Sequence, residues 1–243
     1  MTNQVISGRG VSVICGTSIC GEVQNVSEVM STLAKIDTTS HNNVGAVKTS
    51  RPGFSENSEV TIDLGYTGSA AQDAVRTQYD AGTVATWMIV APTASIDRAW
   101  SFSGYVCACG TPKFDKDGNA TMSFKVQPTG QITPLSTAVA GVTDIDVTDQ
   151  GSTALTLSPA FAATTYGYQV TTDLADTGVK ITLTYATAGE SAYVDNVALA
   201  TATASGAITL GTAAGSVIMI PVVVFKTACV PKVIWIEVTH GYV

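Results

Sequence analysis

Charged side chains are scarce in this sequence. Asp, Glu, Lys and Arg make up 13% of its 243 residues, about half their share in an average soluble protein. Among them, 19 acidic residues outnumber 12 basic ones, which gives a net charge of -7 at pH 7. This balance provides no overall attraction to nucleic acid or to an anionic membrane. A protein that grips DNA along a basic surface is therefore excluded, and we expect no membrane insertion.

Histidine is scarce as well, since the chain has only His41 and His240. A Ser/His/Asp or Cys/His mechanism needs a histidine held on a rigid scaffold. His41 lies in a polar stretch and His240 lies close to the C-terminus. The aspartates of DIDVTDQG, residues 144–151, lack the regular spacing and terminal glutamate of a calcium loop. We expect no enzymatic activity and no cofactor.

The sequence also lacks a window apolar enough for a membrane-spanning helix, and its N-terminal residues lack the basic start and apolar run of a signal peptide. We expect the protein to stay in the compartment where it is made. Its five cysteines are an odd number, which argues against a disulfide framework and favours reduced thiols. Cys15, Cys20, Cys107 and Cys109 are enough in number for a four-thiolate zinc site. The CxC spacing of Cys107 and Cys109, however, does not form the tight turn that a CxxC motif provides. We expect small buried apolar residues and no metal.

Thr, Ala, Gly and Val are abundant in place of charged residues, and this composition is typical of β structure. In EVTIDLGY, residues 59–66, apolar side chains alternate with mostly polar ones, which predicts a strand with one buried face. The runs WSFSGYVCAC (100–109) and TMSFKVQ (121–127) flank an Asp-Gly-Asn turn and predict a hairpin. Further strands are expected at 11–14 and 86–91. In EVQNVSEVM, residues 22–30, the spacing of the apolar residues does not distinguish a strand from a helix.

One helix is expected in SAAQDAVRTQYDAG, residues 69–82. Ser69 and Gln72 have the spacing of a capping box, and Gly82 is placed to end the helix. Downstream, PTGQITPLSTAVAG is rich in Pro, Gly, Ser and Thr and predicts a linker. We therefore expect two domains, residues 1–134 and residues 135–243, of which the first is a β-sandwich or open barrel with a flanking helix. The apolar stripe expected on the helix consists of Ala71, Ala74, Val75 and Tyr79.

Several pieces of the first domain resemble, in their order and spacing, the tail tube (major tail) proteins of long, non-contractile-tailed bacteriophages. They are KIDTTSH, RPGFSENSEVTIDLGY, AAQDAVRTQYDAG, TWMIVAP, SFSGYVCACG and MSFKVQPTGQITPL. The resemblance implies a β-sandwich or barrel with one helix, assembled as hexameric rings that stack into a DNA conduit. The cysteine content departs from the family pattern.

The second domain reads as short strands separated by turns, and TALTLSPAFAATTYGYQVTT resembles the opening of cadherin-like or bacterial immunoglobulin-like β-sandwiches. Later runs, VKITLTY, SVIMIPVVVF and KVIWIEVTHGYV, are expected to supply closing strands. Such domains decorate some phage tails and capsids and also occur in adhesins. The residues that carry the resemblance are Leu155, Leu157, Ser158, Pro159, Phe161, Thr165, Tyr168 and Val170.

Between Thr38 and Glu59 lies a polar excursion whose first half has no apolar periodicity. A structureless loop of this length inside a domain is uncommon unless it is functional or disordered. We interpret it as a projecting loop or long hairpin that orders against neighbouring subunits, and the alternative is a disordered surface loop. The residues expected to make this contact are Thr38, Thr39, His41, Asn42, Lys48, Arg51 and Phe54.

The resemblance thus implies a structural virion protein, assembled in the bacterial host cytoplasm into the stacked, hexameric rings of a phage tail tube, with the C-terminal domain on the exterior. Its partners would be further copies of itself and other tail proteins (tape measure, tail tip and terminator), with DNA passing through the lumen without specific binding. Two alternatives stay open. One is a surface adhesion or carbohydrate-binding β-sandwich module, and the other is a tube subunit of another injection system.

Overall fold

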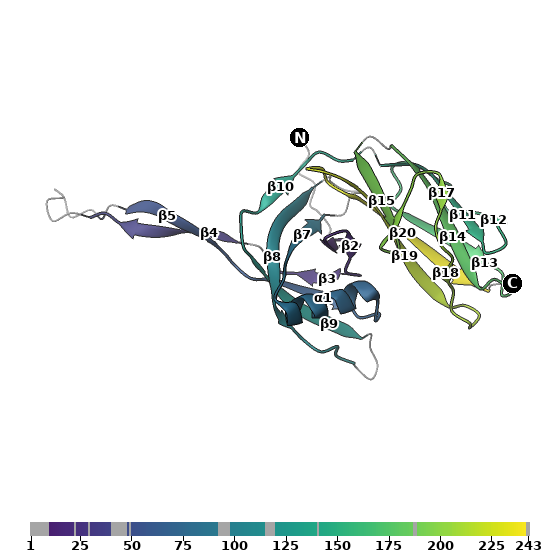
Figure 1. The fold of residues 1–243 in the computed structure, drawn as a ribbon, viewed down its shortest axis with the longest axis horizontal. Helices are drawn as coiled ribbons and strands as arrows, with labels where there is room; N and C mark the ends of the chain where they lie inside the picture. Colours follow the sequence, from purple (N-terminus) through teal and green to yellow (C-terminus); the bar gives the residue numbers. More distant parts are fainter. Residues whose placement is uncertain are drawn as a thin grey trace. The chain divides into compact units, whose positions relative to one another are not determined.

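The computed structural model describes residues 10–21, 23–28, 30–39, 48, 50–91, 98–114, 120–139, 141–186 and 189–241 (Figure 1). These residues form twenty strands and one helix, which confirms the prediction of an all-β protein with a single helix. No helix among them is long and apolar enough to cross a membrane.

By their contacts the residues group into two compact units. The sandwich unit comprises residues 1–20, 88–101 and 133–243, and the hairpin unit comprises residues 21–87 and 102–132. Two strands, β7 (Val84–Val90) and β8 (Ala99–Cys109), run through both units. The contact-based units do not test whether residues 1–134 and 135–243 fold separately, so the domain boundary at 134/135 stays a prediction.

The hairpin unit contains a sheet whose strands follow the order β7-β8-β9-β6-β3. Side chains alternate between a buried face and a polar face because successive residues of a strand point to opposite sides. The buried face includes Trp87 and Phe124, whose ring centroids lie 5.7 Å apart. The predicted strands at 59–66, 100–109 and 121–127 are confirmed, and the ambiguous EVQNVSEVM contains a strand. The remaining bounds are β3 (Val23–Val26), β6 (Val60–Gly65) and β9 (Thr121–Pro128).

Helix α1 (Ala70–Ala81) begins and ends where the sequence predicts. The Ser69 hydroxyl accepts a hydrogen bond from the Gln72 backbone N–H at 3.4 Å, and Gly82 ends the helix with a left-handed φ of 61°. The reciprocal half of the capping box was predicted wrongly. The Gln72 side chain instead holds the preceding turn, accepting from the backbone N–H groups of Thr67 at 3.0 Å and Gly68 at 3.1 Å.

The stripe predicted on this helix is only partly buried. Ala71 and Val75 are 7% and 1% exposed, whereas Ala74 and Tyr79 lie on the exposed side. Arg76 packs against the Tyr79 ring, with its guanidinium carbon 5.4 Å from the ring centroid. The helix therefore buries a narrower face than its sequence period indicates.

The sandwich unit contains two five-stranded sheets that share one apolar core. One sheet has the order β12-β11-β14-β17, with β18 also paired to β14, and the other has the order β13-β20-β19-β15-β16. The strands of the first are β11 (Val142–Asp149), β12 (Ala154–Leu155), β14 (Gly178–Tyr185), β17 (Thr203–Ala204) and β18 (Ile208–Thr209). Those of the second are β13 (Gly167–Thr172), β15 (Glu190–Val194), β16 (Val197–Leu199), β19 (Val217–Lys226) and β20 (Lys232–His240).

Side chains from both sheets, such as Ile181 on β14 and Ile236 on β20, are fully buried in this core. Tyr168 stacks on Phe161 with centroids 6.1 Å apart, and its hydroxyl donates to the Ala162 carbonyl at 2.8 Å. The strands predicted from the apolar runs of this half are confirmed. The immunoglobulin-like or cadherin-like identity of the sandwich stays a prediction.

A second apolar cluster attaches the first strands of the chain to the sandwich. Ile14 and Ile19, from the hairpin β1 (Ser12–Cys15) and β2 (Ser18–Ile19), share it with Val223. The Ile19 backbone N–H also donates to the Asn196 side-chain oxygen at 2.8 Å. Part of the stretch predicted as a linker forms the strand β10 (Thr133–Leu135), which pairs with β8.

Candidate assembly surface: the β4–β5 hairpin and the groove at its base

The polar excursion forms a two-stranded antiparallel hairpin of β4 (Ser31–Asp37) and β5 (Ser50–Asn57). Within the described part of the chain these two strands pair only with each other. Figure 1 shows them extending away from the rest of the hairpin unit. The predicted range Thr38–Glu59 is therefore displaced, since the first arm precedes Thr38 and Glu59 lies beyond the second arm. Every side chain of β4 is exposed, so this strand carries no burial pattern that sequence periodicity detects.

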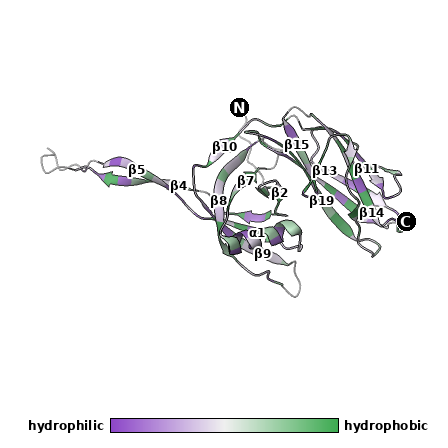
Figure 2. Ribbon diagram, viewed as in Figure 1, coloured by the Kyte–Doolittle hydropathy of each residue, from purple (hydrophilic) through white to green (hydrophobic). Residues whose placement is uncertain are grey.

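The hairpin exposes large apolar side chains. Leu33 is 61% exposed, Ile36 39% and Phe54 88%. Figure 2 shows hydrophobic segments along both strands. An isolated two-stranded hairpin is marginally stable in water because neither of its faces is packed. Exposed apolar side chains and open strand edges together favour contact with another chain.

The predicted contact residues occupy different parts of this hairpin. Thr38 and Thr39 directly follow β4, and Lys48 is an exposed residue between the strands. Arg51 lies on β5 opposite Ile36. Phe54 lies farther along β5. His41 and Asn42 lie outside the described residues.

A carboxylate fixes the turn at the distal end of β4. The Asp37 side chain accepts a hydrogen bond from the Thr39 backbone N–H at 2.8 Å. The hydrogen bonds from the side chain and backbone of Thr39 lower the pKa of Asp37, because they favour its charged form.

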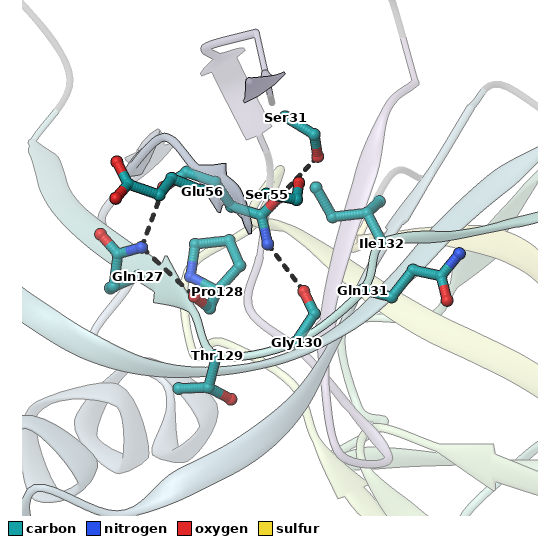
Figure 3. A pocket seen from close by; sticks show the side chains of 10 residues that line it. Ser31, Ser55, Glu56, Gln127, Pro128, Thr129, Gly130, Gln131 and Ile132 are labelled. Atoms are coloured by element: carbon teal, nitrogen blue, oxygen red, sulfur yellow. Dashed lines mark hydrogen bonds between the residues drawn. The ribbon is translucent and has the colours of Figure 1, made fainter. Parts of the chain in front are cut away.

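An open groove of about 880 Å³ lies at the base of the hairpin, between β5 and the residues that follow β9 (Figure 3). The side chains of Glu56 and Gln127 lie on one side of it, and those of Gln131 and Ile132 lie on the other. The lining residues are Ser31, Ser55, Glu56, Asn57 and residues 127–132. Sequence reasoning missed this groove because it joins segments about 70 residues apart, as the contact of Gln127 with Asn57 shows.

Hydrogen bonds within the groove engage the side-chain amides of Gln127 and Asn57. The Gln127 side chain donates to the backbone carbonyls of Asn57 at 3.1 Å and Pro128 at 3.2 Å. The Asn57 side chain donates to the Gly130 carbonyl at 2.7 Å, and its oxygen accepts from the Ser31 hydroxyl at 2.5 Å. These bonds fix the hairpin to β9. They leave the Gln127 side-chain oxygen and the Glu56 carboxylate as acceptors, which favour a positively charged or hydrogen-bond-donating guest.

The polar face of the sheet in the hairpin unit is a second open surface. Its one basic residue in the described structure, Lys125, forms an ion pair with Glu59 at 3.0 Å, and the Asp63 carboxylate accepts from the Asn25 side chain at 3.2 Å. The face is therefore polar and mildly acidic. Its outward-facing residues are Thr61, Asp63, Ser103, Tyr105, Ser123 and Lys125.

The cysteines do not gather into a site. All five are free thiols, and the described residues contain no group of three or more His, Cys, Asp or Glu side chains placed to hold a metal. Burial raises the pKa of the Cys20 thiol, since it disfavours the thiolate. Cys107 lies at a β-bulge in β8, and its thiol donates to the Lys125 carbonyl at 3.4 Å.

The aspartates of DIDVTDQG have structural roles. Asp144 and Asp146 are exposed on β11, and the Asp149 carboxylate accepts from the Thr153 backbone N–H at 2.7 Å. That hydrogen bond lowers the pKa of Asp149. The carboxylates form a solvated strand face and a turn.

No protein-family model matches this sequence, and no curated protein matches it. Among solved structures, the chain is similar to one from the virion of a native gene transfer agent particle, with 10% identity and a TM-score of 0.45 over 54% of this chain and 100% of that one. It is similar to a chain of the anti-feeding prophage baseplate, with 11% identity and a TM-score of 0.46 over 56% of this chain and 98% of that one. It is also similar to the SPP1 tail tube, with 16% identity and a TM-score of 0.42 over 54% of this chain and 78% of that one. These sequence identities and TM-scores are too low to establish the role of the chain.

Proposed function

We propose that this protein is a structural subunit of a phage tail tube, which self-assembles into stacked rings through the β4–β5 hairpin. The observation that carries the proposal is the hairpin itself. It has no packed face, it exposes Phe54 by 88% and Leu33 by 61%, and both of its outer edges are open in the described structure. A monomer gains nothing from such an element, whereas an assembly buries its apolar side chains and pairs its edges.

A tube needs two different surfaces on each subunit, whose contact closes a ring and then adds rings head to tail. The hairpin supplies one surface and the body of the hairpin unit supplies the other. The hexameric ring number is implied by the resemblance of RPGFSENSEVTIDLGY and AAQDAVRTQYDAG to tail tube proteins. Other tail proteins would start and end the stack.

The polar sheet face is our candidate for the lining of the bore. A neutral or mildly acidic lining lets DNA slide, whereas a basic one binds phosphates and slows its passage. Lys125, the basic residue on this face, is neutralised by Glu59 at 3.0 Å. In this arrangement the sandwich is displayed on the exterior of the tail, and DNA passes without specific binding.

Electron microscopy of the purified protein across a concentration series, with light scattering on the same samples, tests the proposal. We expect rings or hollow tubes that become more abundant as the concentration rises. Addition of tail-tip components to a monomeric sample separates a missing initiator from a wrong assignment. Monomers that stay monomers with those components, and that bind carbohydrate through the sandwich, would support an adhesion module instead.

A further inference from the structure

The two ends of strand β5 carry opposite charge. Lys48 and Arg51 are exposed at its distal end, and Glu56 lines the groove at its base. Arg51 and Glu56 are five positions apart in the sequence, which places their Cα atoms about 16 Å apart along an extended strand. This separation is too large for an ion pair within one copy.

The groove at the base suits a basic guest. The side-chain amides of Gln127 and Asn57 are engaged internally, since Gln127 donates to the Asn57 carbonyl at 3.1 Å and Asn57 donates to the Gly130 carbonyl at 2.7 Å. The acceptors that remain include a carboxylate, and hydrogen bonds from Lys or Arg to a carboxylate are the strong ones. A volume of about 880 Å³ is large enough for a strand end with its side chains.

Two other basic residues of the hairpin unit have acidic partners. Lys125 is paired with Glu59 at 3.0 Å, and Arg76 is paired with Asp80 at 3.2 Å. The exposed cations of the hairpin itself are Lys35, Lys48 and Arg51. Of these, Lys48 and Arg51 lie at the end of β5 farthest from the groove, where a second copy reaches them most easily.

We propose that the groove at the base of the hairpin in one copy receives the distal end of β5 from a second copy, with Arg51 pairing to Glu56. The contact is head to tail, because it joins two different surfaces of the same element. The inference rests on the proposed function, since it names the partner surface of the assembling hairpin. It also fixes the direction in which copies add.

A charge-swap experiment on the full chain tests this pairing. The variants Glu56→Arg, Arg51→Glu and the double variant are compared with the wild type by sedimentation velocity and electron microscopy. Each single reversal should raise the concentration needed for assembly at least about tenfold, because it places like charges in contact. The double variant should restore assembly to within about threefold of the wild type, since the pair is re-formed with reversed sign.

Two matched variants control for charge alone. Asp146→Arg reverses an exposed acidic residue on β11, outside the hairpin and its groove. Lys35→Glu reverses a basic residue on β4, opposite Pro52. Both should change the assembly concentration by less than about threefold, as exposed charges outside a specific contact do.

Each outcome separates this inference from the tube proposal. The groove pairing would be wrong if all variants formed tubes equally well, or if the double variant did not repair the defect of the single variants. The tube proposal would then be unaffected. If the charge-swap variants changed association but no rings or tubes formed, the groove pairing would be supported and the tube proposal would be wrong. A wild type that never associates, with or without tail-tip components, would overturn both.

Discussion

The β4–β5 hairpin and the β-sandwich place their apolar side chains in opposite ways. Phe54 of the hairpin is 88% exposed, whereas Ile236 of the sandwich is fully buried. The sandwich gains its stability from burial within one chain, at roughly 25 cal/mol per Å² of apolar surface. The hairpin would gain the same stabilisation from a partner, as we propose. One part of the molecule buries its apolar side chains within the chain, and the other leaves them exposed.

This contrast also concerns which residues tolerate change. A buried side chain touches many neighbours, so its loss leaves a cavity that the surrounding structure cannot fill. An exposed side chain has few neighbours within its own chain, so its loss leaves the fold intact. Stability and assembly should therefore respond to different substitutions.

Removal of residues 135–243 should have the largest effect. Ile14, Ile19, Val90 and Ala99 pack against the sandwich residue Val223 in one buried cluster, and the deletion would expose them to water. We expect residues 1–134 alone to aggregate or to lack cooperative unfolding, measured by solubility and circular dichroism. Deletion of residues 42–50 in the full chain is the control, and it should leave a soluble, folded monomer that does not form tubes.

A soluble fragment of residues 1–134 with a sharp unfolding transition would contradict that prediction. Normal tube assembly after the deletion of residues 42–50 would contradict the assembly role of the hairpin.

Substitution of Ile236 by Ala should cost about 2–5 kcal/mol of unfolding free energy, the usual range for truncating a buried Ile. Ile236 is 0% exposed and belongs to the sandwich core. Urea unfolding followed by fluorescence measures the change. Leu33→Ala on β4 is the matched control, with an expected change below about 0.5 kcal/mol. Equal losses for the two variants would remove the contrast between sandwich and hairpin.

Substitution of Phe54 by Ser should leave the unfolding free energy of the monomer within about 0.5 kcal/mol of the wild type. It should nevertheless raise the concentration needed for assembly by about tenfold or more, because exposed aromatic residues are frequent anchors of interfaces. Urea unfolding and sedimentation on the same samples measure the two quantities. Phe114 is 73% exposed and contacts Tyr66. Phe114→Ser is the control, and it should change neither the unfolding free energy nor the assembly concentration. A stability loss without an assembly defect would place Phe54 in the fold instead.

The smallest effect concerns pH. Hydrogen bonds from Thr153 lower the pKa of Asp149 in the folded state. A carboxyl with a lowered folded pKa stabilises the protein above its unfolded pKa of about 3.9, and this contribution is lost as the pH falls through the folded value. Asp149→Asn should therefore flatten the fall in stability below about pH 4, measured by urea unfolding between pH 2 and pH 6. An unchanged pH profile would contradict this.

Sequence reasoning succeeds where a local period reports a buried face. The strand β6 (Val60–Gly65) alternates buried and partly exposed residues, and apolar alternation is visible within a short window. The ends of α1 are equally local, since Ser69 and Gly82 act through their own backbone geometry. Both features could be predicted because the physical cause lies within a few residues.

The same reasoning fails where the cause is long-range. β10 (Thr133–Leu135) is a strand because it pairs with β8, although its composition is typical of a linker. β4 has no buried side chain, so periodicity placed the first arm of the hairpin too late. The groove was missed because Asn57 and Gln127 meet only in the folded chain. In each case the information lies in a partner segment.

The central claim is that the β4–β5 hairpin is completed by another copy of the chain. Hydrogen–deuterium exchange of the hairpin, compared between monomeric and assembled protein, tests this most directly. We predict rapid exchange of the β4 and β5 amides in the monomer and strong protection in the assembly, while the core strands β19 and β20 stay protected in both. A hairpin that is equally protected in the monomer, or that exchanges equally fast in the assembled state, would contradict the claim.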